Sequence, residues 1–282
     1  MDDLHSLNDA INKKAGRKLL PSIIVSLGIL GVVFSSVYYI PIAFGVLVWL
    51  AVMIAIRELV HAYKLGGIEV PELAIQIAGT ALLVSTWYGK VSSLAVATAI
   101  AIPNVLVFML FKNPKDFVRR GASAAFAIFY LPFLAGFILL LAHHESGAAR
   151  ILTLVVLVTC NDTFAYFSGV LFGKHPLAPH ISPKKTWEGF AGSIIATTIG
   201  SALVFHLALH KSFWIGALIG VMAVVTGTCG DLIESAVKRD LSIKDMGAIL
   251  PGHGGILDRI DSVLFTGPAV WFVLEVIKHF SL

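Results

Sequence analysis

The chain has 282 residues, of which 57% are hydrophobic and 13% are charged, and its mean hydropathy is +0.87. Soluble domains average about 25% charged residues, so this composition excludes an ordinary water-soluble domain and indicates a helical chain that crosses a bilayer many times. The net charge of +4 does not indicate nucleic-acid binding, because membrane proteins retain lysine and arginine at their cytoplasmic face.

The first predicted element is a polar segment, residues 1–18, in which Leu4, Leu7 and Ile11 recur at helical spacing. This pattern favours an amphipathic helix on the cytoplasmic membrane surface, although a disordered basic tail fits the same residues. About 20 apolar residues in succession cross a bilayer as one helix. On that measure the sequence predicts about nine transmembrane helices, at residues 19–40, 42–56, 73–88, 91–111, 121–142, 150–172, 189–209, 212–229 and 262–280.

Lysine and arginine test this count independently, because cytoplasmic loops carry an excess of both. With the N-terminus in the cytoplasm, the alternate inner segments hold 17 of the 21 basic residues. The outer segments hold only Lys90, Arg150, Lys211 and Lys278. The sequence therefore predicts an all-α polytopic membrane protein with a cytoplasmic N-terminus and a C-terminus on the outer side.

Acidic residues divide the chain into a scaffold and a chemical region. Eight of the 17 acidic residues fall between residues 162 and 261. We therefore expect residues 19–149 to form helices for scaffolding, dimerisation or lipid access, and residues 150–282 to form a catalytic region that faces the cytoplasm. Its two predicted inner loops, 173–188 and 230–261, combine carboxylates, cations and glycines, and this combination suits a metal-bound polyphosphate.

Three aspartates are the candidate metal ligands. Asp258 and Asp261 stand three residues apart, so near the start of the last predicted helix they share a face and could grip a metal ion. Asp231, at the inner end of the eighth predicted helix, could supply the opposite wall. A structural interpretation fits the same residues, as aspartates at a helix N-terminus that form surface ion pairs with Arg259, Lys238 and Arg239.

The run Pro251–Gly255 contains three glycines, whose backbone N–H groups can approach an anion just before a predicted helix N-terminus. The run thus predicts a phosphate site that includes Gly254 and Gly255, although a plain glycine-rich turn would have the same composition. No Gly-Lys-Ser/Thr follows, so the run is not a Walker loop. His253 could bind phosphate or act as an acid, whereas a histidine in a turn is more often structural.

Asp162 lies near the middle of a predicted helix, about 18 Å from either end at 1.5 Å per residue. A carboxylate at that depth is costly and commonly faces a polar cavity, with a structural hydrogen bond between helices as the alternative.

Adjacent lysines in the next inner loop would ordinarily anchor lipid headgroups, and here a headgroup can itself be the substrate. The polar residues of that loop orient the lysines or cap the following helix. They are Ser182, Lys184, Lys185, Thr186 and Glu188.

Two segments resemble a known family. The run SAVKRDLSIKDMGAILPGHGGILDRID, from Ser235 to Asp261, is similar to the signature of the phosphatidate cytidylyltransferases, the CDP-diacylglycerol synthases. The run NDTFAYFSGVLFGKHPLAPHISPKKTWEG resembles the second block of that family. The two runs lie in roughly the last 120 residues, whereas the first five predicted helices match only in being hydrophobic. The matching signature positions are Ser235, Lys238, Arg239, Lys244, Asp245, Gly247, Pro251, His253, Gly254, Gly255, Asp258, Arg259 and Asp261.

The resemblance implies an integral enzyme of the bacterial inner membrane, with its active site facing the cytoplasm. Its reaction would convert CTP and phosphatidate to CDP-diacylglycerol and pyrophosphate, with Mg²⁺ and K⁺ as cofactors, and the enzyme would be a homodimer. Taken with the residue patterns, the resemblance assigns catalysis to Asp231, Asp258, Asp261, Lys238, Arg239 and His253, with the three aspartates on the metal. It assigns substrate binding to Lys184, Lys185, Ser182, Thr186, Glu188, Arg259, Gly254, Gly255 and Asp162.

The expected reaction is an in-line attack by a phosphate oxygen of phosphatidate on the α-phosphorus of CTP, with pyrophosphate leaving. That oxygen is already anionic near neutral pH, so positioning and metal neutralisation should carry the catalysis.

Two other classes of membrane protein fit part of the sequence pattern. An ion-coupled transporter would use Asp162 but would not need the run Ser235–Asp261, and a polyprenol kinase would share a CTP site but release CDP.

Overall fold

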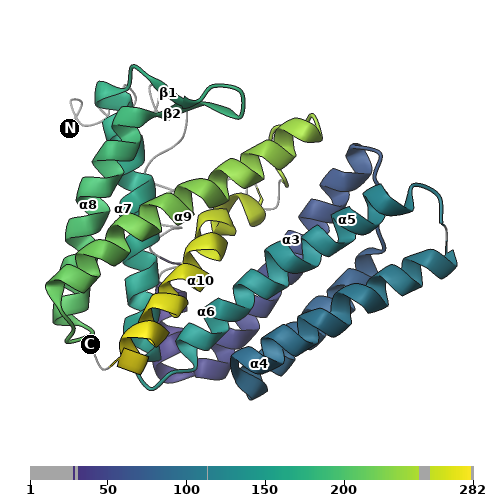
Figure 1. Cartoon of the computed structure of the whole chain (residues 1–282), viewed down its shortest axis with the longest axis horizontal. Helices are drawn as coiled ribbons and strands as arrows, with labels where there is room; N and C mark the ends of the chain where they lie inside the picture. The colour runs from purple at the N-terminus through teal and green to yellow at the C-terminus, as the bar shows by residue number, and fades with distance from the viewer. Residues whose placement is uncertain (1–27, 29–30, 113, 248–254, 281–282) are drawn as a thin grey trace, which may run out of the picture.

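The computed structural model describes residues 28, 31–112, 114–247 and 255–280, which fold almost entirely into helices (Figure 1). The predicted helical membrane architecture is confirmed, and a short antiparallel hairpin of two strands, which hydropathy did not predict, is added to it. The elements are α3 Pro41–Leu65, α4 Glu72–Lys112, α5 Phe117–Ile128, the π-helix η1 Phe129–Phe133, α6 Leu134–Ala142, α7 Gly147–Phe172, β1 Pro176–Ala178, β2 Ser182–Thr186, α8 Trp187–Leu207, α9 Phe213–Asp240 and α10 Leu257–Phe280.

Seven helices in the described part of the chain are long and apolar enough to cross a bilayer. One of them joins α5, η1 and α6 into a continuous span, Phe117–Ala142. This number does not support the predicted count of nine. Half of the predicted helix 19–40, residues 19–27, 29 and 30, lies outside the described residues, and so does the predicted segment 1–18.

The other difference in the count arises at α4, which contains two predicted helices, 73–88 and 91–111. Its 41 residues would measure about 60 Å if straight, about twice the hydrocarbon core of a bilayer. Lys90 interrupts α4 with φ 65° and ψ −168°. The break that hydropathy predicts between two helices is therefore present as a change of backbone conformation within one continuous element.

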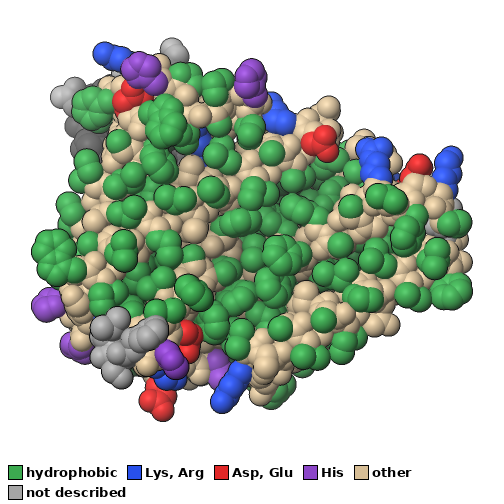
Figure 2. All heavy atoms as spheres, viewed as in Figure 1, with side chains coloured by type: hydrophobic (Ala, Val, Ile, Leu, Met, Phe, Trp, Pro, Cys, Tyr) green, Lys and Arg blue, Asp and Glu red, His purple; other side chains and the backbone are tan. Residues whose placement is uncertain are grey.

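The outside of the protein carries side chains that a soluble protein would bury. Phe111 is 86% exposed and Trp214 is 79% exposed. Figure 2 shows hydrophobic side chains over most of one face, with charged groups gathered toward its upper and lower margins. Because helices satisfy their own backbone hydrogen bonds, such a surface is stable against lipid. The protein is therefore an integral membrane protein.

Close helix contacts through small residues hold the C-terminal half together. A Cβ added at Gly220 of α9 would stand 2.6 Å from the Cα of Thr198 in α8. Small residues allow such approaches, which supply the packing that the hydrophobic effect does not supply between helices in lipid. α10 packs against α9 on one side and α6 on the other (Figure 1). It thereby joins the two halves of the protein.

We expect Gly220→Ala to lower the free energy of unfolding by about 1–3 kcal/mol, the usual cost of overpacking, because the contacted atoms of α8 are backbone. Gly31→Ala is the matched control, since the described residues leave nothing within 4 Å of a Cβ there. Thermal unfolding in detergent measures both variants. Equal melting temperatures for Gly220→Ala and wild type would contradict the close contact.

Candidate active site

The segments that the sequence assigned to the inner side meet around α9. The hairpin β1–β2 and the end of α9 lie at the same end of the protein (Figure 1). Arg239, near the end of α9, donates from Nε to the carbonyl oxygen of Ile181 in the hairpin turn at 3.2 Å. Lys185 of β2 lies 2.5 Å from a carboxylate oxygen of Asp231 in α9. The two segments that the sequence predicted as inner loops, 173–188 and 230–261, are therefore in contact, although residues 230–240 continue helix α9 and do not form a loop.

A cluster of three carboxylates, which we call the acidic cluster, lies between α9 and α10. It consists of Asp231, Glu234 and Asp261, and one carboxylate oxygen of each lies within 4.8 Å of the others. Asp231 and Glu234 share a face of α9 because they stand three residues apart. Gly230 lets α10 approach, since a Cβ there would stand 2.6 Å from the carbonyl oxygen of Asp261. Two of the three predicted ligands are thus brought together.

Asp258 does not belong to the acidic cluster. Its carboxylate accepts a hydrogen bond from Lys238 at 2.8 Å and from the backbone N–H groups of Met246 and Gly255 at 3.2 and 2.8 Å. Lys238 also lies 2.5 Å from Glu234. The contact present at Asp258 is therefore the ion pair that the sequence left open as the alternative, and Lys238 links Asp258 to the acidic cluster.

Glu234 is the member of the cluster that the sequence analysis missed. It is 1% exposed, and its Oε1 has no hydrogen-bond partner among the described residues. A buried carboxylate oxygen without a donor is costly, and oxygen ligands of this kind are what Mg²⁺ takes. The residues present therefore fit a divalent cation. The spacing of Glu234 from Asp231 is the sequence signal that would have found it.

The loop between α7 and α8, residues 173–186, carries Lys184 and Lys185 and contains the hairpin β1–β2. The side chains of Thr186 and Glu188 hold it in place. Thr186 caps α8, since its Oγ1 accepts from the N–H of Gly189 at 3.1 Å. Glu188 accepts from the N–H groups of Lys174 and His175 at 3.1 and 3.2 Å and contacts the imidazole of His175 at 2.6 Å. Both predicted binding residues thus have structural contacts that fix the hairpin on α8.

The remaining members of this loop differ in exposure. Lys185 is half-buried against Asp231, Lys184 is exposed, and Ser182 begins β2 in a half-buried position. Of the two adjacent lysines, Lys185 is thus the one in contact with the acidic cluster.

The described start of α10 offers fewer N–H groups to a phosphate than the sequence suggested. The N–H of Gly255 donates to Asp258 at 2.8 Å. The next two, of Ile256 and Leu257, donate to the carboxylate of Glu58 in α3 at 3.0 and 2.9 Å. His253 and Gly254 lie outside the described residues. Of the glycine N–H groups predicted to bind an anion, only that of Gly255 is described, and a carboxylate of the protein occupies it.

Asp162 and Arg259 flank the acidic cluster without joining it. Asp162 lies within α7 and accepts from the side chain of Asn161 at 3.1 Å. Electrostatic interactions connect Asp162 with Asp231, Lys185 and Arg259. Arg259, in the first turn of α10, is exposed. These residues place charge around the cluster rather than inside it.

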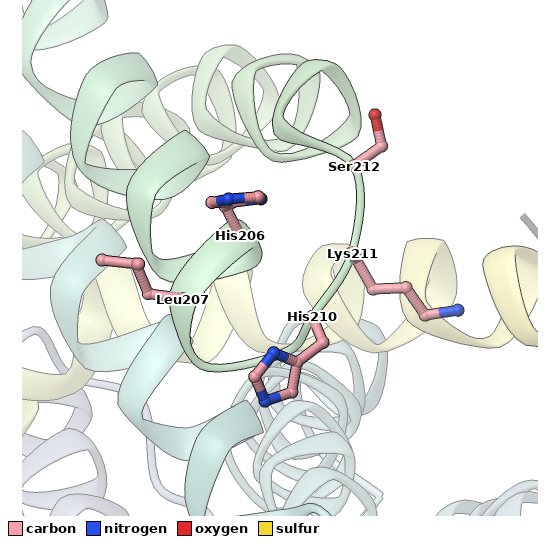
Figure 3. A pocket seen from close by; sticks show the side chains of 5 residues that line it. All are labelled: His206, Leu207, His210, Lys211 and Ser212. Carbon is pink, nitrogen blue, oxygen red and sulfur yellow. The ribbon is translucent and has the colours of Figure 1, made fainter.

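A separate pocket of about 510 Å³ lies at the turn between α8 and α9 (Figure 3). Lys185, which contacts Asp231 of the acidic cluster, lies in β2 at the opposite end of α8. This pocket is therefore distinct from the candidate active site, and none of the described residues that line it carries a carboxylate. Its lining residues are His206, Leu207, His210, Lys211 and Ser212.

Known proteins match most of this chain. The sequence model of the cytidylyltransferase family matches residues 21–277. The phosphatidate cytidylyltransferase of Mycobacterium bovis is 35% identical over 278 residues, 94% of this chain and 90% of that protein. That of Mycobacterium leprae is 36% identical over 280 residues, with the same shares. That of Staphylococcus haemolyticus is 35% identical over 231 residues, 80% of this chain and 87% of that protein. The similarity thus extends well beyond the two C-terminal segments.

Proposed function

Because the chain belongs to the cytidylyltransferase family, we propose that it transfers CMP from CTP to phosphatidate, giving CDP-diacylglycerol and pyrophosphate. The predicted family and the predicted enzyme class, a nucleotidyltransferase, are confirmed. The observation that carries the proposal within the structure is the acidic cluster, in which a buried oxygen of Glu234 has no donor among the described residues.

In this proposal Asp231, Glu234 and Asp261 hold Mg²⁺, which supplies charge neutralisation for the reacting phosphates when it is bound. Glu234 takes the ligand position first expected for Asp258, and Asp258 orients Lys238 instead. K⁺ is proposed as a second cation, and its effect is tested by exchanging K⁺ for Na⁺ in the assay.

Cationic side chains border the acidic cluster on two sides. Lys185 contacts Asp231 from the hairpin, and Lys238 contacts Glu234 from one helical turn further along α9. Both can bind phosphate oxygens and reduce the repulsion between two anionic substrates. No strong general base is needed, because the attacking oxygen of phosphatidate already carries charge. Positioning by these side chains is thus the main contribution of the chain to the reaction.

The proposal places the active site on the cytoplasmic side of the bacterial inner membrane, with nine transmembrane helices and a homodimeric assembly. Contacts among the predicted inner segments support this sidedness. Arg119 and Arg120, at the start of α5, donate to the carbonyl oxygens of Gly66 and Glu69 beyond α3 at 3.2 and 2.6 Å. Basic loops gathered at one end follow the rule that lysine and arginine remain inside.

The test is an assay in detergent that supplies CTP, phosphatidate and Mg²⁺ and follows pyrophosphate and CDP-diacylglycerol together. We expect both products in equal amounts from wild type and neither from Asp261→Asn. Release of CDP with a polyprenol acceptor would indicate a kinase. Folded wild-type protein that makes neither product with K⁺ present would overturn the proposal.

We expect Lys185→Met to lower kcat/KM for CTP by about 10- to 100-fold, the effect of losing one hydrogen bond to a charged group. The reason is its position against Asp231. Lys184→Met, one residue away and exposed, should cost less. Steady-state kinetics at saturating phosphatidate measures both, and a larger loss for Lys184→Met would reverse the assignment of the two lysines.

A further inference from the structure

Glu58 is a buried carboxylate in the half of the chain that the sequence analysis treated as scaffold. It lies near the inner end of α3 and is 4% exposed. A charged group at that depth is costly unless hydrogen bonds compensate it. Its compensation comes from α10, almost 200 residues away in sequence. The N–H of Ile256 donates to Oε1 at 3.0 Å, and the N–H of Leu257 donates to Oε2 at 2.9 Å.

These two bonds make Glu58 a cap for α10 supplied by another helix. The first N–H groups of a helix have no partner within it, and a negative charge there also interacts favourably with the helix dipole. Each carboxylate oxygen of Glu58 binds a different N–H. This pair of hydrogen bonds therefore constrains both the position and the rotation of the first turn of α10.

Two glycines of the family-like run close around this carboxylate. A Cβ on Gly255 would stand 2.6 Å from Oε2 of Glu58, and a Cβ on Gly247 would collide with Oε1. A side chain at either position would push the carboxylate away. The space left by these glycines is thus filled by Glu58, which accounts for both of them without a phosphate.

The first turn of α10, which Glu58 holds, is followed closely by two residues of the candidate active site, Asp258 and Asp261. Asp258 follows Leu257 directly and binds Lys238, and Asp261 is one turn further along the same helix, in the acidic cluster. A rotation or shift of the α10 start would therefore move Asp261 relative to Asp231 and Glu234. Sub-ångström placement of ligands matters for metal affinity and for rate.

We propose that Glu58 is a positioning residue, which holds the start of α10 so that Asp261 meets Asp231 and Glu234 in a geometry that binds the cation. The consequence for turnover rests on the proposed function and the consequence for cation binding rests on the proposed cation site, whereas the consequence for the first turn of α10 rests on neither. Glu58 acts through α10 and touches none of the three cluster residues in the contacts that the structure records. The N-terminal half thereby takes a direct part in building the site.

The test uses Glu58→Gln in the full-length protein, because glutamine keeps the size but offers a single acceptor oxygen. Glu72→Gln is the matched control, a glutamate in the same half whose carboxylate contacts Arg57 at 3.5 Å and Gln76 at 3.1 Å. Hydrogen exchange followed by mass spectrometry reports on the peptide that contains Ile256 and Leu257. Titration calorimetry with Mg²⁺ reports cation binding without any turnover.

We expect Glu58→Gln to speed exchange in that peptide, to weaken Mg²⁺ binding by about 10- to 100-fold, and to lower kcat in a way that added Mg²⁺ partly restores. Glu72→Gln should match wild type in all three. Unchanged exchange at Ile256 and Leu257, or unchanged Mg²⁺ binding with a general loss of stability, would overturn the positioning role.

If Glu58→Gln does not purify as folded protein, Glu58→Asp replaces it with the same expected results, because its shorter side chain cannot reach both N–H groups. Wild-type protein that makes no CDP-diacylglycerol would count against the proposed function alone. The exchange and calorimetry results would still decide the role of Glu58.

Discussion

Replacing Glu234 with glutamine is expected to reduce CDP-diacylglycerol formation by roughly 1,000-fold, comparable to the loss of a preorganised group that stabilises charge in an active site. Glu234 carries a buried oxygen that has no partner in the described part of the chain, and the amide offers a weaker ligand of nearly the same shape. Lys238 keeps its contact with Asp258 in this variant. The protein should therefore remain folded while its cation site is impaired.

Asp240→Asn is the matched control for this prediction, since Asp240 ends the same helix and is exposed. Initial rates across a range of Mg²⁺ concentrations separate weaker binding of the cation from slower chemistry at saturation. A Glu234→Gln protein with a wild-type rate and wild-type Mg²⁺ dependence would remove Glu234 from the cation site. That result would return the third ligand position to Asp258.

Local sequence patterns were sufficient for features that depend on neighbours along one helix. Hydropathy located the apolar helices, because each must match the bilayer thickness by itself. The sequence expected Asp231 and Asp261 at the ends of two spans, and both lie in the acidic cluster. The predicted end of the eighth helix at residue 229 was wrong, because α9 continues to Asp240 and Asp231 therefore lies within the helix. Glu234 stands three residues after Asp231, so the same spacing argument puts it on the same face of α9.

Features that depend on contacts between distant segments could not be derived in this way. Asp258 and Asp261 have the same residue type and lie on one helix, yet of these two aspartates only Asp258 accepts hydrogen bonds from Lys238 and from the N–H of Met246. Nothing near Glu58 in the sequence indicates that it reaches Ile256 and Leu257. The glycine run likewise predicts close approach by an anion, and at Gly255 that anion is a carboxylate of the protein itself.

Lys238→Met is expected to lower the free energy of unfolding by about 3 kcal/mol, because removal of one partner from a buried ion pair leaves uncompensated charge. The ammonium group of Lys238 lies 2.5 Å from Glu234 and 2.8 Å from Asp258, and both carboxylates are largely buried. Without the ammonium group, the carboxylates of Glu234 and Asp258 lose the positive charge that compensates them. Glu234 also lies next to the carboxylates of Asp231 and Asp261, the other two members of the acidic cluster. We therefore also expect activity to be lost, since the repulsion distorts the same carboxylates that hold the cation.

Thermal unfolding in detergent, with Lys64→Met as the matched control at the exposed C-terminal end of α3, measures the effect on stability. The double variant Glu234→Gln/Lys238→Met distinguishes charge from packing, because it removes one of the two carboxylates that Lys238 compensates. If charge is the cause, the double variant should be more stable than Lys238→Met alone, which a double-mutant cycle expresses as a coupling free energy. Additive losses would instead mean that the methylene chain of Lys238, rather than its charge, stabilises this part of the protein.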